Sequence, residues 1–158
     1  MHEVCLLLGS NIQPENNLAK GVDLLRQKVT VVQHSSAWET PSIGSTGPDF
    51  LNMALLITTT LEAGELKEKV LRPLEAQLGR VRSADKNAPR PIDIDIMIFD
   101  GQLLDANLFK YAHRAVPVAE ILPDFRSAQG ETLREAAYKL VKTSPIRLKP
   151  DVLNERNR

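Results

Sequence analysis

The sequence predicts one α+β domain, in which helices cover an antiparallel sheet. Three observations lead to this class. The chain has 158 residues, which is a usual size for one domain, and we assign residues 1–158 to it. Its 42% hydrophobic and 25% charged residues are typical of a chain that buries a core. Short β-branched runs alternate along the chain with segments whose apolar residues recur at helical spacing, which indicates mixed layers.

The first half of the chain has the order strand, helix, strand, strand. Residues 4–8 are a short apolar run, typical of a buried strand. Pro14 suits the first turn of a helix over 14–28, where apolar residues recur three or four positions apart. The stretch 29–38 is rich in β-branched residues and predicts a second strand, and 51–61 predicts a third.

The second half adds a helix, the clearest strand and a helical extension. A helix is expected over 63–78, with a kink at Pro73 because proline cannot donate a backbone hydrogen bond. A strand is expected over 92–99 and a helix over 131–141, and the tail from about residue 143 should be extended or mobile. The resulting β-α-β-β-α-β order is that of ferredoxin-like domains. This order predicts the fold alone, because the same fold carries many functions.

The charge balance disfavours functions that depend on bulk electrostatics. Lys plus Arg and Asp plus Glu both number 20, whereas nucleic-acid binders are usually basic. Aromatic residues make up only 4%, which also disfavours the alternative of a ferredoxin-like RNA-binding domain. No apolar run approaches the ~20 residues of a membrane helix, and Cys5 is the only cysteine. We therefore expect a cytoplasmic protein with neither nucleic acid nor membrane as a partner.

The predicted strand 92–99 carries the strongest chemical signal. Asp93 and Asp95 alternate along it and therefore share one face. Aspartate is disfavoured in strands, and two like charges this close raise each other's pKa unless a cation lies between them. Mg²⁺ takes oxygen ligands, typically one or two carboxylates together with substrate phosphates. A solvated polar face is the simpler alternative for such a pair taken alone. The opposite face is expected to be core, with isoleucine at positions 92, 94, 96 and 98.

Two long loops flank this strand and its predicted neighbour. Residues 79–91 contain Arg80, Arg82 and Arg90, and guanidinium groups suit the oxygens of a polyphosphate. Residues 39–50 form a loop rich in Pro and Gly, long enough to indicate a functional segment. The sequence has neither a G-x-x-x-x-G-K-[ST] loop nor a G-x-S-x-G nucleophile motif. This pattern predicts direct phosphoryl transfer, with phosphates held by arginines and metal.

Five segments resemble the 6-hydroxymethyl-7,8-dihydropterin pyrophosphokinase family of folate biosynthesis. The matches run from about Val4 to Phe99, with a weaker echo to Pro123. They are Leu8-Gly9-Ser10-Asn11, Trp38-Glu39-Thr40-Pro41-Ser42-Ile43-Gly44, Pro48-Asp49-Phe50-Leu51-Asn52, Leu78-Gly79-Arg80-Val81-Arg82 and Pro89-Arg90-Pro91-Ile92-Asp93-Ile94-Asp95-Ile96-Met97.

The resemblance implies an activity and its cofactors. The family transfers the β,γ-pyrophosphoryl group of ATP to the hydroxymethyl oxygen of the pterin and releases AMP. It implies that Asp93 and Asp95 hold two Mg²⁺ ions, and that Arg82 and Arg90 bind the triphosphate with Arg80 nearby. Phosphoryl transfer of this kind needs charge neutralisation and in-line placement more than a strong base.

The resemblance also implies two binding pockets, one for each substrate. For ATP, besides Arg82 and Arg90, it implies Glu75 and Ile96 in the nucleotide pocket and His113 on a phosphate. For the pterin it implies Thr40, Pro41, Ile43, Gly44, Phe50 and Asn52.

The sequence departs from the family pattern in two places. Asn87-Ala88 stand where the family usually has a tryptophan and a glycine. After His113 a segment is shortened that, in the family, carries an arginine for the triphosphate and an aromatic for the second pterin face. Arg114 is the candidate to replace the arginine, and Phe109 or Phe125 the aromatic. A divergent paralogue that acts on a related pterin, or binds without turnover, is therefore the alternative, and the oligomeric state, including a monomer, is left open.

Overall fold

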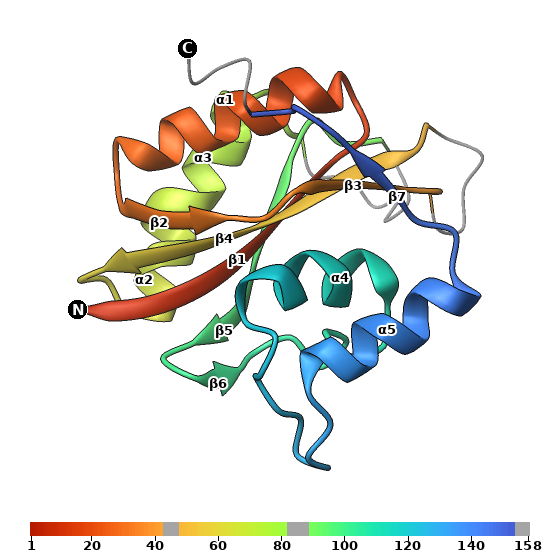
Figure 1. The fold of residues 1–158 in the computed structure, drawn as a ribbon. Helices are drawn as coiled ribbons and strands as arrows, with labels where there is room; N and C mark the ends of the chain where they lie inside the picture. The colour runs from red at the N-terminus through yellow and green to blue at the C-terminus, as the bar shows by residue number, and fades with distance from the viewer. Residues whose placement is uncertain (43–47, 82–88, 154–158) are drawn as a thin grey trace.

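One antiparallel sheet organises the molecule (Figure 1). The structure is a computed structural model and describes residues 1–42, 48–81 and 89–153. Within these residues no helix is both long and apolar enough to span a membrane. The elements are β1 (His2–Ser10), α1 (Pro14–Arg26), β2 (Thr30–His34), β3 (Ala37–Thr40), β4 (Phe50–Thr59), α2 (Ala63–Leu66), the π-helix η1 (Lys67–Leu71), α3 (Arg72–Gln77), β5 (Asp93–Phe99), β6 (Gln102–Leu103), α4 (Ala112–Ile121), α5 (Leu133–Thr143) and β7 (Arg147–Lys149).

The sheet confirms the predicted α+β class and its antiparallel pairing. Along the described chain the strand order is β6-β5-β1-β4-β3-β7, and β2 also pairs with β4. β1 is central, with β4 on one side and β5 on the other. The described order up to β5 is consistent with the predicted β-α-β-β-α-β order, except that the predicted second strand is divided into β2 and β3; β6, α4, α5 and β7 follow.

Helices cover both faces of the sheet, and each face has its own apolar cluster. Figure 1 shows α1 and α3 on one side and α4 and α5 on the other. Alternate residues of β1 supply both clusters, because successive side chains of a strand point to opposite faces. Val4, Leu6 and Leu8 lie in the cluster under α1, whereas Cys5 and Leu7 lie in the cluster under α4 and α5.

The predicted alternation along β5 is right for its first half and wrong for its second. Ile94 and Ile96 lie on the α1 side as expected, but Ile98 lies in the opposite cluster together with Met97. The cause is a bulge, because Cys5 pairs with Ile98 while Leu6 pairs with Ile96. One extra residue reverses the face of every residue beyond it.

The single strand predicted over 29–38 is divided into β2 and β3. Both pair with β4, but Ser35 and Ser36 interrupt the ladder between them. Ser35 Oγ accepts a hydrogen bond from Ala54 N at 2.8 Å, and Ser36 N donates to the Glu120 carboxylate of α4 at 3.2 Å. Ser35 thus stays bonded to β4, with its hydroxyl in place of a backbone carbonyl, whereas Ser36 links the sheet to α4.

Proline residues account for two further differences between the predicted and the observed helices. The helix predicted over 63–78 is present, but its expected kink at Pro73 takes the form of η1, where Arg72 N donates to Lys67 O. A wider turn of this kind rearranges the backbone bonds ahead of a proline. α4 was not predicted as a separate helix, because Pro117 lies inside it.

Candidate active site

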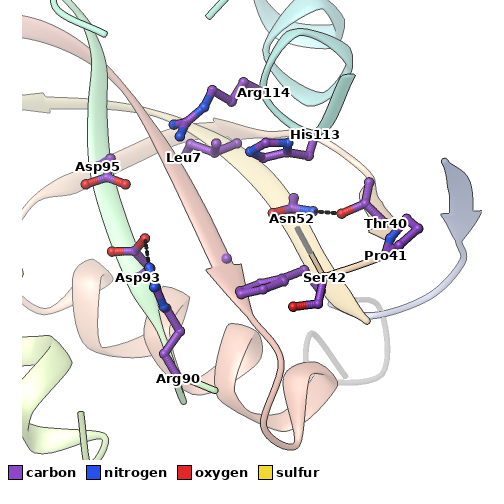
Figure 2. Close-up of a pocket in the computed structure, with 12 residues that line it drawn as sticks. Leu7, Thr40, Pro41, Ser42, Asn52, Arg90, Asp93, Asp95, His113 and Arg114 are labelled. Atoms are coloured by element: carbon purple, nitrogen blue, oxygen red, sulfur yellow. Dashed lines mark hydrogen bonds and ion pairs between the residues drawn. The ribbon is translucent and has the colours of Figure 1, made fainter. Parts of the chain in front are cut away.

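The floor of the site is a row of residues on three neighbouring strands. Gly9 of β1 pairs with Asn52 of β4 on one side and with Asp93 of β5 on the other. Because Gly9 has no side chain, it leaves an opening between an amide and a carboxylate. A cleft of about 230 Å³ occupies this position (Figure 2). It is lined by Leu7, Gly9, Thr40, Pro41, Ser42, Phe50, Asn52, Arg90, Asp93, Asp95, His113 and Arg114.

Asp93 is held by two arginines. Arg80 Nη1 donates to its Oδ1 at 2.5 Å, and Arg90 Nη1 donates to its Oδ2 at 3.2 Å. Burial favours the neutral acid, but the two guanidinium groups outweigh burial and lower the pKa of Asp93 below its ordinary value. Asp93 is therefore ionised at neutral pH, and it holds the guanidinium groups of Arg80 and Arg90 beside the cleft.

Asp95 lies in a different electrostatic environment from Asp93. Burial, followed by the negative charge of Asp93, raises the pKa of Asp95 to about 6. Figure 2 shows the two carboxylates one after the other along β5. The ionised form of Asp95 is thus less favourable than that of an ordinary aspartate, and a bound cation would stabilise it.

Glu75 lies beneath the carboxylate pair and ties α3 to β5. Its side chain is buried, and Oε2 accepts hydrogen bonds from Ile94 N at 2.8 Å and from Arg80 Nη1 at 3.5 Å. Oε1 accepts from Arg72 Nη1 at 3.0 Å. Charge-assisted bonds of this kind set the position of Arg80, and through it the position of Asp93.

Asn11 joins the loop ends that border the cleft. Its Oδ1 accepts a hydrogen bond from Arg90 N at 2.7 Å, and its Nδ2 donates to Pro48 O at 3.4 Å. Asn11 is buried, so these bonds satisfy a side chain that water does not reach. The site thus depends on Asn11 for the placement of Arg90.

The first turn of α4 forms the wall above the floor. Arg114 Nη1 donates to Asp105 Oδ2 at 3.0 Å, and within the described residues its buried Nε has no hydrogen-bond partner. Figure 2 shows Arg114 above Leu7, and His113 on the side of Asn52 and Thr40. Adjacent residues of one helical turn therefore face the two halves of the cleft.

The half of the cleft opposite the carboxylates is aromatic and hydrogen-bonding. Asn52 Nδ2 donates to Thr40 Oγ1 at 3.0 Å and to Trp38 O at 3.4 Å, which fixes the plane of its amide (Figure 2). Trp38 Nε1 in turn donates to Glu120 of α4 at 2.6 Å. Together with the ring of Phe50, this half suits a flat ligand with a polar edge.

A second hollow meets the cleft at Asp95. It measures about 290 Å³, and its walls combine aliphatic residues with Lys67, Asp95 and Asp105. Asp95 lines both the hollow and the cleft, so a ligand that extends from one into the other passes this carboxylate. The hollow is lined by Ala63, Gly64, Lys67, Leu71, Ile94, Asp95, Ile96, Leu104 and Asp105.

The structure brings most of the residues named from the sequence into one place. Arg80 and Glu75 lie beneath the floor, and Ile96 lines the second hollow. Arg82, Ile43 and Gly44 lie outside the described residues. Nine of the named residues line the cleft: Thr40, Pro41, Phe50, Asn52, Arg90, Asp93, Asp95, His113 and Arg114.

The aromatic replacements suggested by the sequence are wrong. Phe109 and Phe125 pack against the apolar cluster under α4 and α5, with ring centroids 6.2 Å apart, and neither lines the cleft. Their burial explains the difference, because nothing in the local sequence distinguishes a core phenylalanine from a ligand-stacking one. The cleft is also lined by Gly9 and Ser42, which the sequence did not identify as ligand-binding residues.

The fold and the two-sided cleft together define a class of protein. An ion-paired carboxylate row beside an aromatic, amide-edged pocket is the site of a transferase that brings a charged donor to a flat acceptor. Comparison with known proteins narrows this class. Residues 5–123 match the family model described as 7,8-dihydro-6-hydroxymethylpterin-pyrophosphokinase. The chain therefore belongs to this pyrophosphokinase family.

Relatives agree with this assignment, and a solved structure is similar in fold. A Methylorubrum extorquens protein named 2-amino-4-hydroxy-6-hydroxymethyldihydropteridine pyrophosphokinase is 39% identical over 152 residues, which are 89% of this chain and 94% of the relative. A Pseudomonas aeruginosa protein of the same name is 30% identical, over 85% of this chain and 90% of its own. The crystal structure of Plasmodium falciparum HPPK-DHPS is similar in fold, with a TM-score of 0.72 at 11% identity; 89% of this chain matches 41% of that longer one.

Proposed function

We propose that this chain transfers the β,γ-pyrophosphoryl group of ATP to the hydroxymethyl oxygen of 6-hydroxymethyl-7,8-dihydropterin in folate biosynthesis. The products are the pterin diphosphate and AMP. A new bond forms between that oxygen and the β-phosphorus, and AMP leaves with the bridging oxygen. The family supports the chemistry, and the structure supports its placement in the cleft.

The position of Asp95 is the observation that carries the proposal. It lies where the cleft meets the second hollow, and the two spaces are lined by different side chains: Phe50 and Asn52 in the cleft, Ile94 and Ile96 in the hollow. The hollow, with aliphatic walls at Ile94 and Ile96, suits the base and sugar of a nucleotide, and the aromatic and amide half of the cleft suits the pterin. A triphosphate that joins the two spaces passes Asp95, and both Arg90 and Arg114 line the cleft that it enters.

The arginines supply the positive charge that the transferring group needs. Arg90 pairs with Asp93, and Arg114 pairs with Asp105, so both are held in place before a substrate binds. Groups held in this way stabilise developing charge without reorganising during the reaction. Phe50 and Asn52 fix the acceptor, which places its oxygen for in-line attack.

The donor set of the site fits Mg²⁺. Among residues 1–42, 48–81 and 89–153 no group of three or more His, Cys, Asp or Glu side chains could hold a metal ion. Two carboxylates that rely on substrate phosphates for the remaining ligands are nevertheless a usual Mg²⁺ environment. Burial and the charge of Asp93 raise the pKa of Asp95, and a cation bound beside it would offset both effects. We propose that Asp93 and Asp95 hold two ions, which when bound neutralise triphosphate charge.

Product analysis tests the proposal. ATP, Mg²⁺ and 6-hydroxymethyl-7,8-dihydropterin should give AMP and pterin diphosphate in equal amounts, resolved by ion-exchange chromatography. AMP should not form without the pterin, and chelation of the divalent cation should stop it. No AMP above background with this pterin or with related pterin alcohols would overturn the proposal, and ADP as the product would indicate a different transfer.

Replacement of Gly9 by alanine should weaken acceptor binding selectively. A Cβ atom at Gly9 would lie 3.2 Å from Asn52 Oδ1, and Asn52 is fixed by Thr40. Displacement of that amide costs roughly one hydrogen bond, so we expect the KM of the acceptor to rise about 3- to 10-fold. The KM of ATP should stay unchanged, and steady-state kinetics with each substrate varied in turn measures both. A larger effect on ATP than on the acceptor would contradict the assignment of this half of the cleft.

A further inference from the structure

A third acidic residue, Asp105, lies between the second hollow and the cleft. Its side chain lines the hollow together with Asp95, and its ion-pair partner Arg114 lines the cleft. A triphosphate that runs from one space into the other carries negative charge past this carboxylate, and like charges at short range repel each other. Asp105 therefore opposes binding of the donor by itself, and any benefit to the site must pass through another residue.

The two carboxylate oxygens of Asp105 have different partners. Oδ1 accepts a hydrogen bond from Asn107 N at 2.8 Å, which closes the turn that follows β6. Oδ2 accepts a hydrogen bond from Arg114 Nη1 at 3.0 Å. The backbone N–H of Asp105 donates to Met97 O at 3.3 Å, so this carboxylate is anchored on β5, the strand that carries Asp95. Asp105 thus links β5 to the first turn of α4.

The position of Arg114 depends on this link. Among the residues that the structure describes, Asp105 is its one ion-pair partner, and its buried Nε has no hydrogen-bond partner. Figure 2 shows its guanidinium group extending from α4 toward β5. Burial and the charge of Asp93 raise the pKa of Asp95, whereas the charge of Arg114 opposes that rise, so the guanidinium group acts at the point where the two spaces meet. A long side chain that has a single anchor takes its orientation from that anchor.

We propose that Asp105 is a positioning residue for pyrophosphoryl transfer, which acts by holding Arg114 beside the path of the triphosphate. The inference rests on the proposed function, which supplies the triphosphate. Arg114 Nη1 stays with Asp105, and the other N–H groups of the guanidinium group are left for the transferring group. Since Asp105 adds no attraction for the donor, its contribution belongs to the transition state, and it should appear in kcat and not in the KM of ATP.

Replacement of Asp105 by asparagine separates these effects. Asparagine keeps an oxygen for Asn107 N and favours the same turn, but it removes the charge that pairs with Arg114. In D105N kcat should fall about 10-fold, as expected when a hydrogen bond to a charged group is weakened. The KM of ATP should stay within about 2-fold of wild type or fall, because a repulsive charge has left the hollow. The matched control is D124N, which breaks an exposed pair with Arg134 at 2.9 Å and should change neither parameter.

A double-mutant cycle tests whether the effect of Asp105 passes through Arg114. R114A alone should lower kcat about 100-fold, as removal of one donor to a transition state does. D105N/R114A should match R114A within about 2-fold, because a positioning residue has no effect once the group that it positions is absent. The calorimetric stoichiometry of ATP binding gives the folded fraction of each variant, so that kcat refers to folded protein.

The outcomes distinguish this inference from the proposed function. If D105N lowers kcat as much in the R114A background as in wild type, Asp105 does not act through Arg114 and the inference is overturned. A higher KM of ATP with unchanged kcat in D105N would assign Asp105 to direct nucleotide binding and overturn it, and wild-type kinetics in D105N would do the same. Absence of AMP formation by the wild-type protein would instead overturn the proposed function, and the inference with it.

Discussion

Replacement of Asp95 by asparagine should abolish pyrophosphoryl transfer while leaving the protein folded. Asparagine keeps the size of the side chain but removes the charge that we assign to cation binding at the meeting point of the two spaces. Removal of one electrostatic contact to a transition state typically costs about 100- to 1,000-fold in turnover, and loss of a metal ligand should reach the upper part of this range. AMP formation under saturating substrates measures the loss.

The same substitution should stabilise the apoprotein. The pKa of Asp95 is raised from 3.8 to about 6, so the folded state binds a proton more tightly than the unfolded state. The resulting cost to stability is absent well below pH 4, grows as the pH rises toward 6 and is complete above it. D95N should therefore raise the free energy of unfolding by about 1–3 kcal/mol at pH 8, and the gain should shrink at pH 4.

Urea unfolding in the absence of nucleotide and divalent cation, at both pH values, tests this gain. The matched control is D23N, at an exposed position of α1, which should change neither turnover nor the pH dependence of stability. Wild-type turnover in D95N would remove the metal assignment. Lost turnover together with lost stability would instead indicate that Asp95 is a structural residue.

Replacement of Glu75 by alanine should destabilise the fold strongly. Only 2% of Glu75 is exposed, and its carboxylate accepts hydrogen bonds from Arg72, Arg80 and the backbone of Ile94. The substitution leaves two guanidinium groups and a buried N–H without this partner. Breaking a buried ion pair on one side costs about 3–5 kcal/mol in free energy of unfolding. Turnover should fall too, because Arg80 holds Asp93 in place.

Chemical denaturation of E75A and E75Q separates this role from direct nucleotide contact. Glutamine keeps an oxygen for Ile94 N but loses the charge, so E75Q should lie between wild type and E75A. E68A, at an exposed position of η1, is the control and should be neutral. A wild-type denaturation midpoint in E75A, combined with weaker ATP binding, would place Glu75 in the nucleotide pocket instead of beneath the site.

The order of the elements was predictable because each core helix and strand carries its own periodicity. The errors arose where a tertiary feature overrides that periodicity. A bulge opposite Cys5 moves Ile98 to the other face of the sheet, and Ser36 leaves the ladder to bond Glu120 of a distant helix. Pro117 lies within α4, where local rules predict a break.

The charged half of the site was more predictable than the acceptor half. Asp93, Asp95 and Arg90 are close in sequence, so a strand pattern and the loop before it bring them together. The environment of Arg114 depends on Asp105, and the role of Gly9 depends on its pairing with Asn52; both are contacts between distant segments. No local signal distinguishes a stacking ring such as Phe50 from a core ring such as Phe125.

A crystal structure with a non-hydrolysable ATP analogue, Mg²⁺ and 6-hydroxymethyl-7,8-dihydropterin tests the central claim most directly. The account predicts cation density bound to Asp93 and Asp95, and a triphosphate that passes Asp95 between the hollow beside Ile96 and the cleft. It predicts the pterin beside Asn52. A nucleotide bound elsewhere, or carboxylates without a cation in the presence of bound nucleotide and Mg²⁺, would contradict it.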